Sequence, residues 1–186
     1  TLDPAATQAL LRQAPLAYRT QINDMLLTAL AQALAQQAGA DAPERIRIDI
    51  EGHGREAAPD APDISRTVGW FTTLYPVALD ARGDSGQALK RVKETLRAVP
   101  RNGLAYGPLH GASHQAAGVL FNYLGQFDGS FNAGGWQPAG QAPGATMDAG
   151  APLWHALSVE GQVYDGRLAI SFGSVSYTHL TLPTKA

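Results

Sequence analysis

One short stretch constrains the fold more than any other, because an alternating strand runs directly into a glycine-rich turn. Within Arg45–Ile50, isoleucines alternate with charged residues, which is the period of a β-strand with one apolar face and one polar face. The same alternation places Glu51 on the polar face. Gly52 and Gly54 follow and predict positive φ angles or the close approach of another group. A carboxylate at a strand end beside such a gap is a candidate catalytic acid or base.

Helix and strand signals alternate along the rest of the chain and predict an α/β fold. Expected helices span residues 3–13, 21–37 and 84–99, and expected strands span 45–51, 72–79, 119–124, 154–164 and 167–174. Pro15 is expected to end the first helix. The apolar run at 119–124 predicts a strand buried on both faces, and Asp165-Gly166 predicts a hairpin turn. The expected buried stripe of the second helix is Ile22, Met25, Leu26, Ala29, Leu30, Ala33 and Leu34.

Composition excludes several classes of function. The chain has 186 residues, of which 45% are hydrophobic and 16% charged, as in a globular domain with a packed core. A net charge of −2 provides no electrostatic basis for binding nucleic acid or an anionic membrane. The absence of cysteine rules out disulfides and thiolate chemistry. No apolar run reaches membrane-spanning length and we expect no signal peptide, so a cytoplasmic location is the default expectation.

Two apparent motifs do not satisfy the structural context that their function requires. The glycines at 52 and 54 partly match a dinucleotide-binding fingerprint, but prolines follow where that fingerprint must open a helix. His110 and His114 have the spacing of a helical metal site, but Gly111 disfavours the helix and no glutamate accompanies them. We therefore interpret this pair as loop histidines.

Asn122 and Tyr123 interrupt an otherwise apolar strand, and two interpretations stay open. In the first, Asn122 satisfies backbone groups while the Tyr123 ring belongs to the core with its hydroxyl bonded. In the second, both side chains face a cavity that they share with Glu51.

Four stretches, in this order, resemble the second half of the epimerization domain of nonribosomal peptide synthetases. The resemblance covers about residues 15–176, and the helix that begins at Ile22 also fits it. The stretches are Glu51-Gly52-His53-Gly54-Arg55-Glu56, Arg66-Thr67-Val68-Gly69-Trp70-Phe71-Thr72, Pro100–Gly107, and Phe121-Asn122-Tyr123-Leu124-Gly125-Gln126-Phe127.

The resemblance implies a place in the condensation-domain superfamily, whose fold is similar to that of chloramphenicol acetyltransferase. Two α/β lobes, each a mixed β-sheet with packed helices, then form a V around a central tunnel. We expect residues 1–176 to be the C-terminal lobe, with residues 177–186 as an atypical tail and a candidate cloning or sequencing artefact. The implied partners are a peptidyl carrier protein domain, the N-terminal lobe of the same domain and adjacent synthetase modules. No intrinsic cofactor or metal is implied, because the substrate arrives on the carrier's phosphopantetheine arm.

The implied reaction is inversion at the α-carbon of a carrier-bound aminoacyl or peptidyl thioester. By motif match, Glu51 is the expected acid/base and Arg55 orients or stabilises anionic groups. Asn122 and Tyr123 are expected to line the tunnel. The family's second catalytic residue lies in a His-His-x-x-x-Asp motif of the first lobe, and this chain contains no adjacent His-His pair. We therefore expect the isolated chain to be inactive.

Two alternatives stay open: a condensation-domain lobe that forms peptide bonds, and a non-catalytic lobe that docks carriers. The motif that begins at Glu51 favours epimerization, because condensation domains usually lack it.

Overall fold

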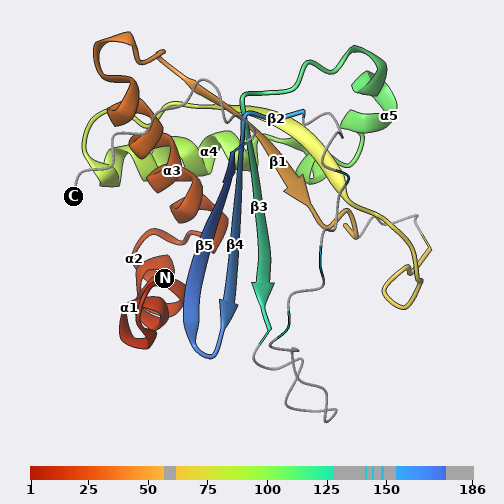
Figure 1. The fold of residues 1–186 in the computed structure, drawn as a ribbon, viewed down its shortest axis with the longest axis horizontal. Helices are drawn as coiled ribbons and strands as arrows, with labels where there is room; N and C mark the ends of the chain where they lie inside the picture. Colours follow the sequence, from red (N-terminus) through yellow and green to blue (C-terminus); the bar gives the residue numbers. More distant parts are fainter. Residues whose placement is uncertain (57–61, 128–140, 142–143, 145–147, 149–153, 175–186) are drawn as a thin grey trace.

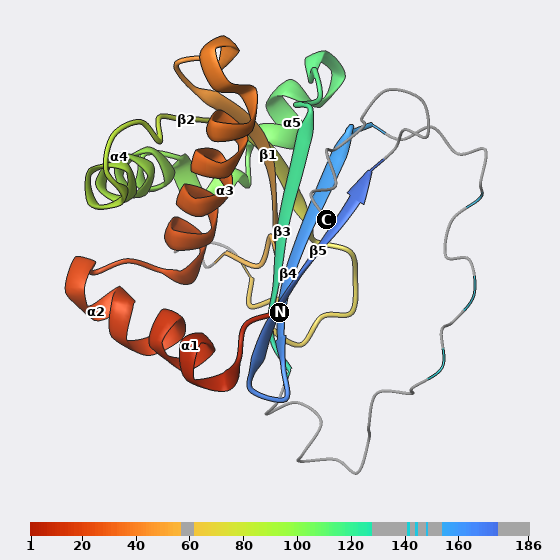
Figure 2. The same ribbon diagram turned by 60° about the vertical axis from the view of Figure 1, so that its left-hand side comes forward.

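A computed structural model describes residues 1–56, 62–127, 141, 144, 148 and 154–174 of the chain. Its centre is one five-stranded β-sheet, and helices α3 and α4 lie together on one side of that sheet (Figures 1 and 2). The predicted α/β class, a mixed sheet with packed helices, is confirmed. The predicted tail at 177–186 lies outside the described residues.

The sheet is mixed, with the strand order β2-β1-β3-β4-β5. The three central strands β1, β3 and β4 run parallel, and the edge strands β2 and β5 run antiparallel to their neighbours. The predicted hairpin is confirmed, because β4 and β5 are joined at Asp165 and Gly166, whose φ angles of 50° and 65° suit a tight hairpin turn. The strands are β1 (Ile46–Gly52), β2 (Thr73–Leu79), β3 (Val119–Gln126), β4 (Leu157–Tyr164) and β5 (Arg167–Ser174).

The helices are short except for two. The longer ones are α3 (Ile22–Ala38), which Gln21 and Asp24 cap reciprocally, and α4 (Ser85–Arg97), which Asp84 caps. Gly39 follows the last residue of α3 and caps it. The shorter helical segments are α1 (Pro4–Gln8), η1 (Ala9–Gln13), α2 (Ala14–Tyr18), η2 (Gly39–Asp41), η3 (Pro100–Gly103), α5 (Tyr106–His110) and η4 (Gly111–Ser113). None of the helices in the described ranges has the length and apolar character needed to cross a membrane.

The hydrophobic core fills the space between the sheet and the two longer helices. Leu27 of α3, Ile48 of β1, Val92 of α4 and Phe121 of β3 are all at most 1% exposed and belong to one cluster. Burying such side chains is the main favourable contribution to folding. One face of the sheet is thereby committed to packing, which leaves its second face for polar side chains.

The predicted apolar stripe of α3 coincides only in part with the face that packs against the sheet. The fully buried positions are Asp24, Leu27, Thr28 and Ala31, which also follow three-and-four spacing. Leu26, Leu30 and Leu34 are only partly buried and pack around this core. The helix is apolar over more than half its circumference, so spacing alone could not tell which edge of that arc meets the sheet.

Three local predictions also need correction. Pro15 does not end the helical region. The π-helical turn η1 follows α1, and Pro15 then lies in the first turn of α2. In a first turn the backbone N–H has no partner within the helix, so a proline there loses no hydrogen bond. The interpretation of His110 as a loop residue is wrong, because His110 is the last residue of α5. Strand β3 is buried on one face only, since Phe121 is buried while Leu120 and Asn122 are half-buried.

Candidate active site

Polar side chains form a row across the face of the sheet opposite α3 and α4, which we call the polar face. Glu51 on β1 is paired in register with Asn122 on β3, and Asn122 is paired with Glu160 on β4. Since paired residues on adjacent strands share a face, the three side chains lie side by side. The predicted neighbours Glu51 and Asn122 are thus brought together, and Glu160 is a neighbour that the sequence analysis missed.

The environment of Glu51 favours its protonated form. Burial raises the pKa of the Glu51 carboxyl above its usual range, and the negative charge of Glu160 raises it further. A hydrogen bond from the Asn122 side chain acts in the opposite direction on this pKa but does not cancel the rise. A carboxyl whose pKa is moved toward neutral pH can both take up and release a proton, which is the property required of an acid/base catalyst.

The glycines after Glu51 allow the chain to pass close to the segment that leads into β2. Gly54 has a φ of 65°, and a Cβ atom there would lie 1.5 Å from the carbonyl oxygen of Phe71. At Gly52, a Cβ atom would lie 2.8 Å from the hydroxyl of Thr73. Both predicted reasons for glycine, positive φ and close approach, are therefore confirmed. His53 and Glu56 form a contact of 3.3 Å across the same turn.

The Arg55 guanidinium holds the loop between β1 and β2. It donates hydrogen bonds to the carbonyl oxygens of Ile64 at 2.6 Å and Thr67 at 2.9 Å, and it lies 4.3 Å from the centre of the Phe71 ring. These contacts tie the second predicted motif to the first. The role of Arg55 in orienting anionic groups stays a prediction.

The structure does not bring Tyr123 to the face of Glu51. Strand alternation places it with Phe121, and its ring packs against the hydrophobic core on the helix side. Its hydroxyl is buried with no hydrogen-bond partner among the described residues, and burial raises its pKa. Each of the two open interpretations therefore holds for one residue. Asn122 lies beside Glu51, as the second interpretation predicted, whereas the Tyr123 ring is in the core, as the first predicted.

A second polar cluster, missed by the sequence analysis, surrounds Asp49 on the same strand and face as Glu51. Asp49 is fully buried, and its Oδ2 atom lies 3.0 Å from His114 Nε2 and 2.9 Å from His155 Nε2. The backbone N–H of Ala117 donates to the same oxygen at 2.9 Å. Tyr106 completes this Asp49 cluster, with its hydroxyl 3.2 Å from His114 Nδ1.

The members of the Asp49 cluster are far apart in the sequence. The only sequence signal for the cluster was the charge of Asp49 in the middle of an isoleucine-rich strand. His114 and His155 are 65 and 106 residues away from Asp49. The contacts are those of hydrogen bonding, and the part of the chain that the structure describes contains no group of three His, Cys, Asp or Glu side chains suited to a metal ion.

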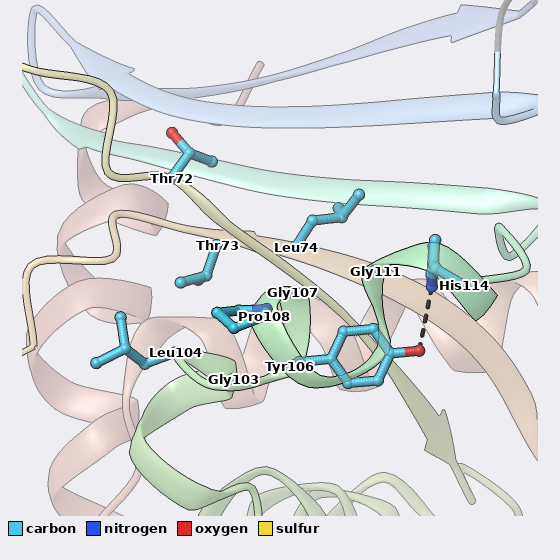
Figure 3. A pocket seen from close by; sticks show the side chains of 10 residues that line it. All are labelled: Thr72, Thr73, Leu74, Gly103, Leu104, Tyr106, Gly107, Pro108, Gly111 and His114. Carbon is cyan, nitrogen blue, oxygen red and sulfur yellow. Dashed lines mark hydrogen bonds between the residues drawn. The ribbon is translucent and has the colours of Figure 1, made fainter.

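A pocket of about 310 Å³ lies between β2 and α5, next to this cluster (Figure 3). Figure 3 shows the Tyr106 hydroxyl directed at His114 along one wall of this β2–α5 pocket. Leu74, which is paired in register with Glu51, lies on another wall, so the pocket is one strand away from the candidate acid/base. The lining residues are Thr72, Thr73, Leu74, Gly103, Leu104, Tyr106, Gly107, Pro108, Gly111 and His114.

Comparison with known sequences shows where such a chain occurs. The family model of the condensation domain matches residues 1–173. The chain is 42% identical over 178 residues to bacitracin synthase 3 of Bacillus licheniformis, with 91% of this chain and 3% of that protein covered. It is also 45% identical over 184 residues to a chondramide synthase of Chondromyces crocatus, with 92% and 4% covered. The chain thus spans only a few per cent of the length of these relatives.

Solved structures agree with this assignment. The epimerization domain from the third module of tyrocidine synthetase B is 34% identical with a TM-score of 0.81, over 92% of this chain and 40% of that one. The first condensation domain of the CDA synthetase is 17% identical with a TM-score of 0.61, over 94% and 38%, and shows the likeness of fold alone. The chain belongs to the condensation-domain family of nonribosomal peptide synthetases.

Proposed function

We propose that this chain is the glutamate-bearing part of an epimerization domain, which inverts the α-carbon of an aminoacyl or peptidyl thioester. Domains of this family act on substrates that phosphopantetheine arms of carrier proteins present, without a cofactor of their own. The observation that carries the proposal is the half-buried Glu51 carboxyl, whose pKa is raised and whose neighbour is Asn122. The 34% identity to a solved epimerization domain supports the same assignment.

In the proposed reaction, Glu51 exchanges a proton with the α-carbon of the substrate. A thioester acidifies its α-proton, and removal of that proton by the carboxylate breaks the C–H bond and leaves an enolate and a protonated Glu51. Return of a proton to the opposite face of the enolate completes the inversion and requires a second acid, which the family resemblance assigns to a histidine of the other lobe. Asn122 holds the Glu51 carboxyl in place through its hydrogen bond.

The other predicted site residues have indirect roles in this proposal. Arg55 holds the loop through residues 64–71 beside the Glu51 turn. Tyr123 is the next residue after Asn122 on β3, and its ring packs into the core on the opposite face of that strand. Both roles are proposals about positioning, because Arg55 is bonded to backbone carbonyl oxygens of the loop and Tyr123 lies on the opposite face of the sheet from Glu51.

The test follows deuterium incorporation at the α-carbon in D₂O, with the carrier-bound L-thioester and the chain joined to its first lobe. We expect Glu51→Gln to slow exchange by about 100-fold or more, as loss of a general acid/base does. Glu94→Gln, an exposed change on α4, is the matched control and should leave exchange unchanged.

Three results would contradict the proposal. Exchange that survives in Glu51→Gln would remove Glu51 from the chemistry. Peptide bond formation without exchange in the unmodified protein would assign the chain to condensation instead, and the absence of both activities would leave a carrier-docking lobe.

A further inference from the structure

The Asp49 cluster determines the hydrogen-bonding character of the β2–α5 pocket. As a carboxylate, Asp49 can only accept hydrogen bonds, so His114 must donate to it from Nε2. In a neutral imidazole, the other nitrogen then carries a lone pair. Nδ1 of His114 is therefore an acceptor, and the Tyr106 hydroxyl must donate its proton to it.

A hydroxyl that already donates its proton to another group can only accept a hydrogen bond from a ligand. The oxygen of Tyr106 keeps its remaining lone pairs, and this residue lines the pocket. The Thr73 hydroxyl behaves alike, because it donates to the carbonyl oxygen of Asn102 at 3.4 Å. Of the three hydroxyl groups in the lining, those of Tyr106 and Thr73 thus have their protons engaged and can only accept from a ligand, and Thr72 carries the third.

The lining also discriminates by charge. None of the ten residues that line the pocket carries a carboxylate, ammonium or guanidinium group. A cationic ammonium would lose its hydration without finding a counter-charge, which is costly in a partly enclosed space. A neutral amide N–H meets both conditions, since it donates one hydrogen bond and carries no charge.

We propose that Asp49 is a positioning residue that acts through His114 to fix the Tyr106 hydroxyl as a hydrogen-bond acceptor. The β2–α5 pocket then binds a neutral amide N–H of the thioester substrate. This inference rests on the proposed function for the identity of the substrate. The hydrogen bonds among Asp49, His114 and Tyr106 do not depend on that function. Two parts of such a substrate contain amides: the pantetheine arm and the peptidyl group. The experiments below distinguish these two sources.

The first experiment determines the protonation of His114 directly in the 186-residue chain. Long-range proton–nitrogen NMR correlation should show His114 in the Nε2–H form. Asp49→Asn should preserve this form, because the amide oxygen of asparagine can occupy the accepting position. Asp49→Ala should produce a mixture of forms. His114 protonated at Nδ1 in the unmodified chain, either alone or together with Nε2, would overturn the proposal because Nδ1 would then donate to Tyr106.

The second experiment measures ligand binding to the same chain, with two probes titrated separately. Pantetheine represents the carrier arm, and N-acetyl-phenylalanine methyl ester represents a peptidyl amide without that arm. Tyr106→Phe should weaken the affinity for whichever probe binds in the pocket by about 2- to 10-fold, the effect of losing one neutral hydrogen bond. Tyr18→Phe on α2 is the matched control and should leave it unchanged.

A third variant separates the pocket from the cluster. Gly107 lines the pocket, and a Cβ atom there would meet nothing within 4 Å, so Gly107→Leu can add bulk at the lining without a clash at its Cβ. It should abolish binding while His114 keeps its Nε2–H form. If neither probe binds, or if Tyr106→Phe leaves both affinities unchanged, the proposal is wrong even where Glu51-dependent exchange is observed. Binding without such exchange would contradict only the proposed function.

Discussion

Asp49 and Glu51 are two carboxylates on the same face of the same strand, and their surroundings differ completely. Asp49 is fully buried and its Oδ2 atom has three N–H donors around it. Glu51, the next residue along that face, is half-buried beside another carboxylate, with a single amide as a stabilising partner. Asp49 is held in place by hydrogen bonds to one of its oxygens, whereas the surroundings of Glu51 disfavour its negative charge. Alternation along β1 therefore placed both carboxyl groups on the polar face, and the neighbouring strands and loops gave them different surroundings.

The largest expected effect is on stability when Asp49 is removed. Asp49→Ala leaves two imidazoles and the Ala117 N–H without their acceptor, and we expect a loss of about 3 kcal/mol or more in the free energy of unfolding. Chemical denaturation measures it. Glu51→Ala is the control on the same face and should cost much less. Equal losses for the two variants would erase the contrast between the sites.

A smaller effect of opposite sign is expected for Glu51→Gln. Because the folded protein raises the pKa of Glu51, ionisation of this group disfavours the folded state. The natural chain should thus lose stability as pH rises from about 4, the usual range of glutamate, through the raised pKa. The variant escapes that loss and should melt at a higher temperature at pH 7, with the difference vanishing below about pH 4. A variant that is less stable at pH 7 would show that Glu51 is stabilised as an anion.

The contribution of each neighbour of Glu51 can be separated by titration. Glu160→Gln removes a negative charge and should lower the pKa of Glu51, while burial keeps that pKa above its usual range. Asn122→Leu removes the hydrogen bond to the carboxylate and should raise it further. Carbon-13 NMR of the glutamate carboxyl measures both shifts. No change in either variant would mean that the row across β1, β3 and β4 is not electrostatically coupled.

The smallest effect is expected for Asp80, an ion-paired carboxylate at the surface that serves as a reference for the other two. Hydrogen bonds from the Arg82 side chain lower the pKa of Asp80 to about 2. Its contribution to stability is therefore present above about pH 4 and is lost as pH falls through about 2. We expect Asp80→Asn to cost less than about 1 kcal/mol at pH 7, and this cost to shrink as the pH falls through about 2. A cost as large as that of Asp49→Ala would show that burial is not what distinguishes Asp49.

Local patterns along the chain determined much of this protein. Alternation placed Glu51 on the polar face, the expected helices at 21–37 and 84–99 formed as α3 and α4, and Asp165-Gly166 formed the hairpin turn. The ordered motifs identified the family as well. Each of these features depends on residues close in sequence, where spacing and backbone preference are sufficient.

Only the tertiary structure decided which side chains meet. Register across β1, β3 and β4 brought Glu160 to Glu51, and the same strand placed Asn122 and the Tyr123 ring on opposite faces. Asp49 found its partners 65 and 106 residues away. Contacts of this kind depend on how strands pair and loops cross the sheet, which the pattern of a single segment does not encode. The pKa of Glu51 and the hydrogen-bonding character of the β2–α5 pocket both follow from such contacts.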